Sequence, residues 1–338
     1  MQRRSASMKH AVCIAAVWSA VLFSCARDAW ATNDGDVVGG PTNDRTPVAA
    51  GLREGVHQAS PDAAETADAA PVVLPGAYQF ALQAAGPDAL PYRIMVSPPT
   101  EPADERGHPV LYVLDGNATF ASFHEARRMQ SKLYGKAIIV AVGYPTDEPL
   151  DFKRRSHDFS PQPAASQHAK PASSGSHTRP LLGGDGAFTA FLRDVLMPEI
   201  ARRHPVDPAQ QSVFGHSFGG MYALHVLFTA PSLFTHYVAV SPSLWWQDRY
   251  LIAEEQHFTA QVKDGTFKPV RHSVLVLAGG AETPQTLQDA QAQAVRLQAL
   301  SGFGLRTHYA ALPDETHMSV PTAAIAMVLR QVFSARQR

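Results

Sequence analysis

Ser217 is the central residue of the pentapeptide GHSFG at positions 215–219, a G-x-S-x-G pattern. A short apolar run at 212–214 precedes the pattern and an apolar stretch at 219–228 follows it, which predicts a strand, a tight turn and a helix. In such a turn the serine takes strained backbone angles, and both flanking glycines are expected to be needed because a Cβ atom at either place would strike the neighbouring strand or helix. The sequence therefore predicts an exposed, nucleophilic hydroxyl. The alternative is a serine that caps the helix, which would not need glycine on both sides.

Two backbone N–H groups are predicted to stabilise the negative charge that forms on a carbonyl oxygen during attack by Ser217. The first belongs to Phe218, which opens the helix after the turn and is assisted by the helix dipole. The second is expected from the loop after the third strand, where Asn117 closes LDGN at 114–117. Asp115 in that loop is interpreted as bracing the turn through its own hydrogen bonds rather than as a reacting group.

A serine nucleophile needs a general base, and His317 is the predicted one. It follows a strand-like segment at 307–312 and precedes the last helical stretch, so it lies on the loop where this arrangement brings a histidine over the nucleophile. His216, next to the serine, is predicted to point away from the hydroxyl and to pack or line the site. His225 lies inside a predicted helix and is interpreted as structural.

Glu282 is the predicted third member of a catalytic triad, because a carboxylate is expected after the strand that precedes the histidine, here 274–278. Its carboxylate would accept a hydrogen bond from the far ring nitrogen of His317, fix the tautomer and stabilise the imidazolium formed during attack. Glutamates after strands are common on surfaces, so the pattern leaves other assignments open. These are Asp289, Asp314, Glu315 and a Ser–His dyad.

Short, nearly continuous apolar runs alternate with helical stretches, a pattern typical of an α/β fold with a mostly parallel sheet and helices on both faces. About eight strands are expected in one domain. The predicted strands are 78–82, 92–96, 110–114, 137–142, 212–214, 237–240, 274–278 and 307–312. The predicted helices include 118–133, 187–203, 219–228, 284–300 and 320–335.

The composition is that of an ordinary globular protein, with 45% apolar and 17% charged residues among 338. The formal net charge is −1 and both signs are spread along the chain, so nucleic acid is not an expected partner. The two cysteines, Cys13 and Cys25, both lie near the start, which excludes a disulfide framework and a cysteine-ligated metal from the body of the chain. The predicted chemistry requires no metal or organic cofactor.

Residues 1–31 have the organisation of a secretory signal peptide. Basic residues at the start are followed by an apolar run at 11–26, too short to span a bilayer comfortably, and AWA before Thr32 supplies small residues for cleavage. We therefore expect a periplasmic or secreted protein with no stable membrane span. The alternative is a lipoprotein anchored at Cys25.

Two later segments lack the alternating pattern. Residues 32–75 are rich in Ala, Asp, Thr, Pro and Gly and are interpreted as a flexible linker before a catalytic domain at 76–338. Within that domain, about 161–186 forms a long insertion rich in Ser, Pro, His and Gly. Its His168 and His177 have no convergent acidic or cysteine partners, so a solvated loop is preferred over a metal site.

With these residues in place, the chain resembles the esterase D-like branch of the α/β hydrolases, and within it the periplasmic esterases that open the trilactone of enterobactin-type siderophores. The resemblance covers about residues 76–336. Its carriers are LYVLDGN at 111–117, VGYP at 142–145, RR at 154–155, DFSP at 158–161, GG at 183–184, GHSFGG at 215–220 and SPSLWW at 241–246. The insertion at 162–179 departs from the shorter loop expected there.

The resemblance implies an α/β-hydrolase fold, ester hydrolysis with Ser217 as nucleophile and His317 as base, and the same two oxyanion donors. It also implies that Arg154 or Arg155 lies near the substrate pocket. Some relatives look like Ser–His dyads, so it leaves the acid open.

A ferric catecholate substrate is anionic and aromatic, and arginine charges and tryptophan ring faces would suit it. The candidate substrate-binding residues are Arg154, Arg155, Trp245 and Trp246. The alternative is that the arginines pair with carboxylates and the tryptophans belong to the core. We expect an exported serine esterase that acts through an acyl-enzyme on siderophore trilactone esters. The alternatives are a general carboxylesterase or acyltransferase of the same fold, and a non-catalytic ligand-binding protein.

Overall fold

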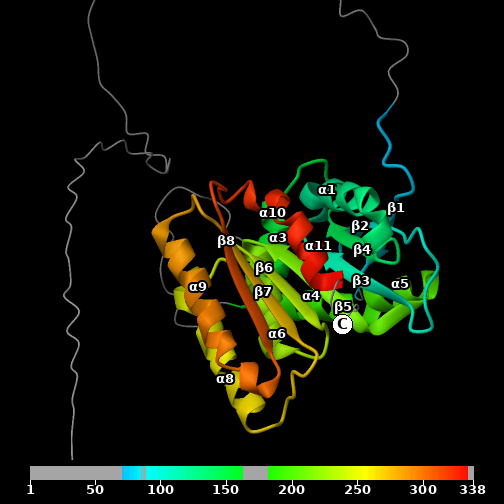
Figure 1. Cartoon of the computed structure of the whole chain (residues 1–338). Helices are drawn as coiled ribbons and strands as arrows, with labels where there is room; N and C mark the ends of the chain where they lie inside the picture. The colour runs from blue at the N-terminus through cyan, green and yellow to red at the C-terminus, as the bar shows by residue number, and fades with distance from the viewer. Residues whose placement is uncertain (1–70, 85, 87–88, 163–181, 334–338) are drawn as a thin grey trace, which may run out of the picture. The chain divides into compact units, whose positions relative to one another are not determined.

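The apolar runs of the sequence become the strands of one sheet in the computed structural model of the chain, which describes residues 71–84, 86, 89–162 and 182–333. The sheet has eight strands in the order β1-β2-β4-β3-β5-β6-β7-β8 (Figure 1). The strands are β1 Tyr78–Gln83, β2 Pro91–Ser97, β3 His108–Val113, β4 Ile138–Gly143, β5 Val206–His216, β6 His236–Val240, β7 Ser273–Gly279 and β8 Arg306–Leu312.

The pairing of these strands confirms the predicted, mostly parallel sheet. β1 pairs antiparallel with β2 and β2 antiparallel with β4, while all strands from β4 to β8 across the sheet are parallel to their neighbours. Every residue of β3, β4, β6 and β7 is buried, as expected for strands that are covered on both faces. Edge strand β1 alternates between half-buried and exposed residues.

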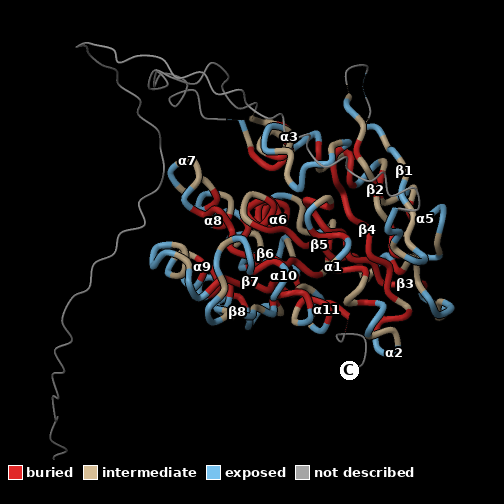
Figure 2. The backbone as a smooth tube through the Cα atoms, turned by 90° about the horizontal axis from the view of Figure 1, so that it is seen from above, coloured by how far each residue is buried: buried red, intermediate tan, exposed pale blue. Residues whose placement is uncertain are grey.

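Helices cover both faces of the sheet, and each face has its own apolar core (Figure 2). Residues of α1, α10 and α11 belong to one core, and residues of α4, α5, α6, α8 and α9 belong to the other. The helices are α1 Gly116–Met129, α2 Ser131–Tyr134, α3 Phe152–Asp158, α4 Asp185–Phe191, α5 Met197–Arg203, α6 Phe218–Thr229, α7 Trp246–Arg249, α8 Leu251–Lys263, α9 Pro284–Gln298, α10 Val320–Ala323 and α11 Ile325–Phe333.

The predicted helices exist, but some of their boundaries differ. The expected helix at 118–133 is divided at Gln130, whose backbone leaves the helical region. The expected helix at 187–203 is α4 and α5 joined by a π-helical turn, Leu192–Leu196. Sequence patterning did not identify α3, because its buried residues are charged rather than apolar. It also missed α8, in which Glu255 interrupts the buried stripe.

This topology explains how distant parts of the sequence reach one place. Strands β5, β6, β7 and β8 are neighbours and parallel, so the loops that follow them leave the same edge of the sheet. Ser217 follows β5, Glu282 follows β7 and His317 follows β8. The three candidate catalytic residues are therefore brought together by strand order.

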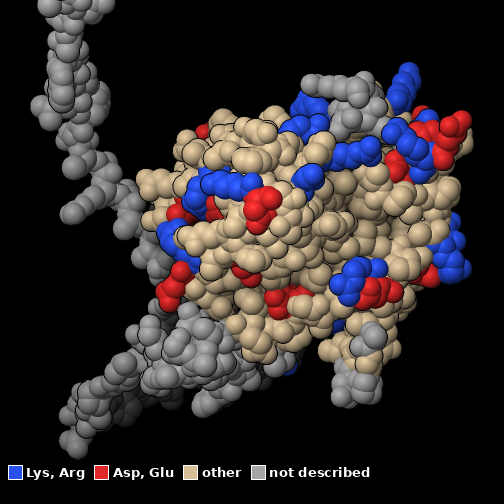
Figure 3. Space-filling view, turned by 90° about the horizontal axis from the view of Figure 1, so that it is seen from below, with Lys and Arg blue, Asp and Glu red and all other residues tan. Residues whose placement is uncertain are grey.

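The predicted signal peptide, most of the predicted linker and residues 163–181 of the insertion, with His168 and His177, lie outside the described residues. None of the described helices has the length and apolar character that a membrane crossing needs. No group of His, Cys, Asp and Glu within the described ranges is arranged to hold a metal ion. On the face drawn in Figure 3, basic and acidic side chains are interspersed.

Candidate active site

Ser217 occupies the sharp turn between β5 and α6. Its backbone angles are φ 58° and ψ −116°, which are strained for a residue with a side chain, and it is the N-cap of α6. Its N–H donates to the carbonyl of Val240 at 2.9 Å, which ties the turn to the end of β6. The residue is half-buried, so its hydroxyl is not sealed inside the protein.

The glycines around the turn differ in their importance. A Cβ atom on Gly215 would collide with the carbonyl of Gly219, as predicted. A Cβ atom on Gly219, however, would meet Oδ2 of Asp115 at 3.4 Å, an ordinary contact, so the prediction that this position needs glycine for space was wrong. Gly220 is the tighter position, because its Cβ would lie 3.0 Å from the carbonyl oxygen of Val240.

His317 reaches the site through a turn that is fastened to the loop after β7. Asp314 takes a left-handed φ of 61° just before it. Gly279, the last residue of β7, and Gly280 after it allow close approach, since a Cβ on Gly279 would collide with the carbonyl of Glu315. The N–H of Gly280 donates to the Leu312 carbonyl at 2.6 Å. These contacts hold the two loops side by side.

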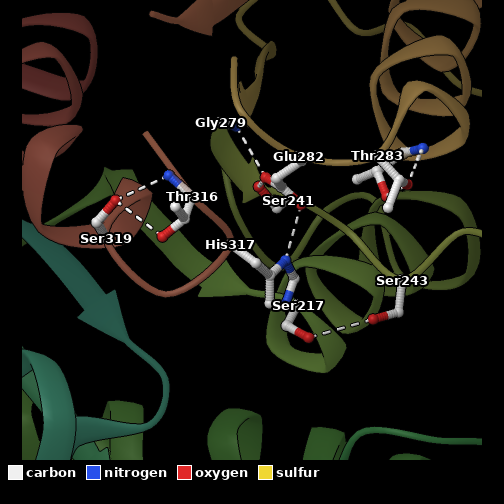
Figure 4. A network of polar contacts seen from close by, with 10 residues as sticks. Ser217, Ser241, Ser243, Gly279, Glu282, Thr283, Thr316, His317 and Ser319 are labelled. Carbon is white, nitrogen blue, oxygen red and sulfur yellow. Dashed lines mark hydrogen bonds and ion pairs between the residues drawn. The ribbon is translucent and has the colours of Figure 1, made fainter. Parts of the chain in front are cut away.

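Glu282 is the carboxylate that contacts His317. Its Oε2 lies 2.9 Å from Nδ1 of His317, and its Oε1 accepts from the N–H of Gly279 at 2.8 Å and from the hydroxyl of Ser241 (Figure 4). Its side chain is 4% exposed. Burial alone would raise the pKa of Glu282, but the hydrogen bonds from His317, Ser241 and Gly279 outweigh it and lower the pKa below its usual value.

The other carboxylates considered from the sequence do not take this position. Asp289 pairs with Arg249 at 2.7 Å on the side of α9. Neither Asp314 nor Glu315 hydrogen-bonds to His317 within the described part of the chain. The geometry therefore favours Glu282 as the partner of the imidazole.

The hydroxyl of Ser217 contacts a second serine. Its Oγ lies 3.3 Å from Oγ of Ser243, and within the described ranges no hydrogen bond joins it to His317 (Figure 4). His317 is nevertheless close, because its ring centroid is 4.6 Å from that of His216, the residue before the nucleophile. In unliganded enzymes the hydrogen bond between nucleophile and base is often long or absent and forms with the substrate.

His216 lines the site without acting as a second base. Burial is the main cause that lowers its pKa, to about 3, and electrostatic interaction with the imidazole of His317 and the guanidinium of Arg155 adds to this. The ring is therefore neutral at physiological pH. This agrees with the predicted packing or lining role.

The candidate oxyanion donors lie at two helix starts. Phe218 is the first residue of α6 and Asn117 is the second residue of α1, so both N–H groups belong to first turns that lack intrahelical acceptors. The side chain of Asn117 has a role that the sequence did not indicate. Its Oδ1 accepts from the N–H of Tyr144 at 2.9 Å, and its Nδ2 donates to the carbonyl of Thr146 at 2.7 Å, which fixes the loop after β4 against α1.

Asp115 and Arg155 form a buried ion pair beneath these helix starts. Nε and Nη2 of Arg155 each lie 2.9 Å from an oxygen of Asp115, and the two side chains are 3% and 4% exposed. Nη2 also donates to the carbonyl of His216 at 3.3 Å. Asp115 braces its turn, as predicted, through this ion pair. For Arg155 the structure shows the alternative considered above, pairing with a carboxylate, which leaves little of its guanidinium for a substrate.

Arg154 and the two tryptophans are more accessible. The guanidinium of Arg154 lies 4.6 Å from the ring centroid of Tyr92 and 4.8 Å from that of Tyr144, and it donates to the carbonyl of Pro91 at 2.6 Å. Trp245 is 58% exposed. Trp246 is half-buried and packs edge-on against Phe218, with ring centroids 4.7 Å apart.

Comparison with known proteins identifies the family of the chain. The family model described as "Putative esterase" matches residues 90–285. The chain is 34% identical over 247 residues to the ferri-bacillibactin esterase BesA of Bacillus subtilis, covering 71% of this chain and 83% of that protein. It is also 34% identical over 221 residues to a siderophore enterobactin esterase of Emericella nidulans, covering 62% of this chain and 72% of that protein.

The crystal structure of the BES protein from Bacillus cereus is similar as well. It superposes with a TM-score of 0.71 at 29% identity, over 79% of this chain and 99% of that one. The sheet order, the strained serine turn and these matches lead to one conclusion: the chain is an α/β hydrolase that belongs to the esterase family and acts on ester bonds.

Proposed function

We propose that the protein is an exported serine esterase that opens siderophore esters through an acyl-enzyme. The observation that carries the proposal is the arrangement of three side chains on the loops that follow β5, β7 and β8. A strained, accessible Ser217 lies beside His317, and the Nδ1 of that imidazole is held by the buried, ionised Glu282. A histidine fixed in this way presents Nε2 as the proton acceptor.

The reaction follows from these positions. Ser217 Oγ exchanges its bond to Ser243 for one to His317, attacks the ester carbonyl carbon and gives its proton to Nε2. The N–H groups of Phe218 and Asn117 hold the oxyanion. The ester C–O bond then breaks, and the departing alcohol takes the proton from His317. Water repeats the attack on the acyl-enzyme, passes its proton to His317, and Ser217 is released and reprotonated.

The substrate class rests on the names of the relatives and on the rim of the site. Two of the relatives named above are esterases of bacillibactin- and enterobactin-type siderophores, which are trilactones that carry catechol rings. Exposed apolar side chains follow strands at the edge of the sheet where the candidate triad lies, namely Trp245 after β6, Met318 after β8 and Phe152 at the start of α3. Such side chains supply apolar contact for aromatic groups of a substrate.

The decisive experiment compares an enterobactin-type trilactone with short-chain p-nitrophenyl esters and identifies the products. We expect a higher kcat/KM for the trilactone, with linear and monomeric acids as products. Ser217→Ala should lower turnover of both substrates by about 10³-fold or more and abolish fluorophosphonate labelling. Equal or better turnover of the p-nitrophenyl esters would indicate a general carboxylesterase. Unchanged activity of Ser217→Ala would contradict the mechanism.

Export is supported by the signal-peptide organisation of residues 1–31. We expect the mature protein, expressed in a bacterium with its own leader, to be found in the periplasm or medium and to begin at Thr32. Amino-terminal sequencing checks this. An intact leader on a cytosolic protein would contradict it, and a lipid-modified Cys25 would indicate an anchored form.

A further inference from the structure

The tripeptide Ser241-Pro242-Ser243 lies between the two ends of the proposed triad. It follows β6, and β6 is the strand between β5, which leads to the nucleophile, and β7, which leads to the acid. The N–H of Ser241 donates to the Leu277 carbonyl on β7 at 2.8 Å. The N–H of Ser243 donates to the Ser217 carbonyl at 3.2 Å. The tripeptide backbone is thus hydrogen-bonded to β7 on one side and to the nucleophile turn after β5 on the other.

The side chain of Ser241 extends this link to the acid. Its hydroxyl donates to Oε1 of Glu282, the oxygen that also accepts from the N–H of Gly279 (Figure 4). Ser241 is 1% exposed and has a left-handed φ of 43°, which is uncommon for a residue with a side chain. A strained residue persists where its surroundings hold it, and strain of this kind gathers at functional sites.

The side chain of Ser243 extends the link to the nucleophile. Its Oγ is 3.3 Å from Oγ of Ser217, and it is the hydrogen-bond partner that the structure gives to that oxygen among the described residues. Ser243 is 5% exposed, so the protein shields its side chain from bulk water. When the Ser217 proton turns to His317, the Ser243 hydroxyl can donate to the lone pair of Ser217 Oγ.

We infer that Ser241 and Ser243 form a bracket that sets the catalytic geometry, Ser241 by orienting the acid Glu282 and Ser243 by holding the nucleophile Ser217. Ser241 is a positioning residue that acts through Glu282. Ser243 touches a reacting atom. The inference rests on the proposed function, since it assigns work to the same triad.

Removal of the Ser241 hydroxyl has a predictable pH signature. Ser241→Ala leaves a buried carboxylate with one donor fewer, so the Glu282–His317 pair takes up its first proton more readily. The acidic limb of the kcat/KM profile should move to higher pH, and kcat should fall about tenfold. The titratable groups that face Glu282 are His317 on the loop after β8, Tyr309 within β8 and His216 at the end of β5.

Removal of the Ser243 hydroxyl should leave a different signature. Ser243→Ala does not alter the hydrogen bonds of Glu282, so the acidic limb should stay where it is. The loss of a hydrogen bond to the attacking oxygen should lower kcat by about 3- to 10-fold with little change in KM. The rate of fluorophosphonate labelling of Ser217 should fall by the same factor. Ser243→Thr, which keeps a hydroxyl, should restore part of both rates.

Ser273→Ala is the matched control. Ser273 is also a buried serine whose Oγ contacts a histidine, His236 Nδ1, at 2.7 Å, but it lies at the opposite end of β7 from the site. Its loss should lower the thermal midpoint without changing kinetics. All variants are compared by thermal unfolding before the kinetics are interpreted.

The outcomes separate the bracket from the proposed function. If Ser217→Ala and Glu282→Gln lose activity while Ser241→Ala and Ser243→Ala keep the wild-type rate and pH profile, the bracket is overturned and the esterase mechanism stands. Slower turnover in both serine variants with no shift of the acidic limb in Ser241→Ala also overturns it, because that pattern fits loss of packing alone. If Ser217→Ala remains active, both the proposed mechanism and the proposed role of the two serines are contradicted.

Discussion

His317 and His225 both contact carboxylates, and they differ in what their second ring nitrogen does. His317 has Nδ1 2.9 Å from Glu282, and its other nitrogen has no carboxylate partner within the described ranges. His225, on α6, has Nδ1 2.9 Å from Glu254 and Nε2 3.1 Å from Asp185. An imidazole can satisfy two carboxylates only when both nitrogens carry protons, so His225 is an imidazolium.

Burial strengthens this difference. The side chain of His225 is 9% exposed, whereas that of His317 is 42% exposed. Burial alone would lower the pKa of His225, but hydrogen bonds to Asp185 and Glu254 raise it to about 9. His225 is therefore a fixed positive charge that joins α6 to α4 and α8. The comparison indicates that a general base needs one carboxylate and one open nitrogen, while a second carboxylate makes a structural ion.

The largest expected effect is a loss of kcat on substitution of His317 that substitution of His225 does not cause. His317→Ala should lower kcat by about 10³-fold, about 4 kcal/mol, because it removes the proton acceptor while leaving the core intact. His225→Gln should keep most of the activity per folded molecule and instead lower the free energy of unfolding, since it leaves two half-buried carboxylates without their cation. Steady-state kinetics and urea unfolding of both variants test the contrast. Comparable loss of kcat in both would show that the distinction is wrong.

Sequence patterning predicted the fold well because the features that determine it are local. Continuous apolar runs mark buried parallel strands, and glycines around Ser217 mark the tight turn, so the mostly parallel sheet and the serine turn could both be predicted. Helix α3 could not be predicted from such local patterns. It is held by the buried pair of Arg155 and Asp115, which is a contact between residues far apart in the sequence.

The candidate site was predicted in outline, and the missing parts are again long-range contacts. The order of Ser217, Glu282 and His317 follows from topology, but no local pattern shows that Gly280 fastens the His317 loop to the Glu282 turn. Ser241 and Ser243 stand in a motif that was noted without a role, because a hydroxyl has no spacing rule that reveals its partner. The single available signal was their position after a central strand.

The smaller expected effect concerns the pH dependence of stability. The pKa of His225 is raised in the folded protein to about 9 from a usual value of 6.5. A group with a raised folded pKa stabilises the fold fully below its unfolded pKa, and this contribution is lost as the pH rises through the folded pKa. The free energy of unfolding should therefore decline between about pH 6.5 and pH 9, by on the order of 3 kcal/mol in total.

Urea unfolding of the wild-type protein and of His225→Gln across this pH range isolates the contribution of the imidazolium. The charged or titratable groups around it are Asp185 on α4, Glu254 on α8, Tyr222 on α6 and Tyr250 between α7 and α8. Burial raises the pKa of both tyrosines, so they stay neutral throughout the range. His157, whose pKa is raised by its hydrogen bond to Asp158, adds a similar slope to both proteins. The wild-type curve should thus fall more steeply than that of the variant, and parallel curves would mean that His225 is not a structural cation.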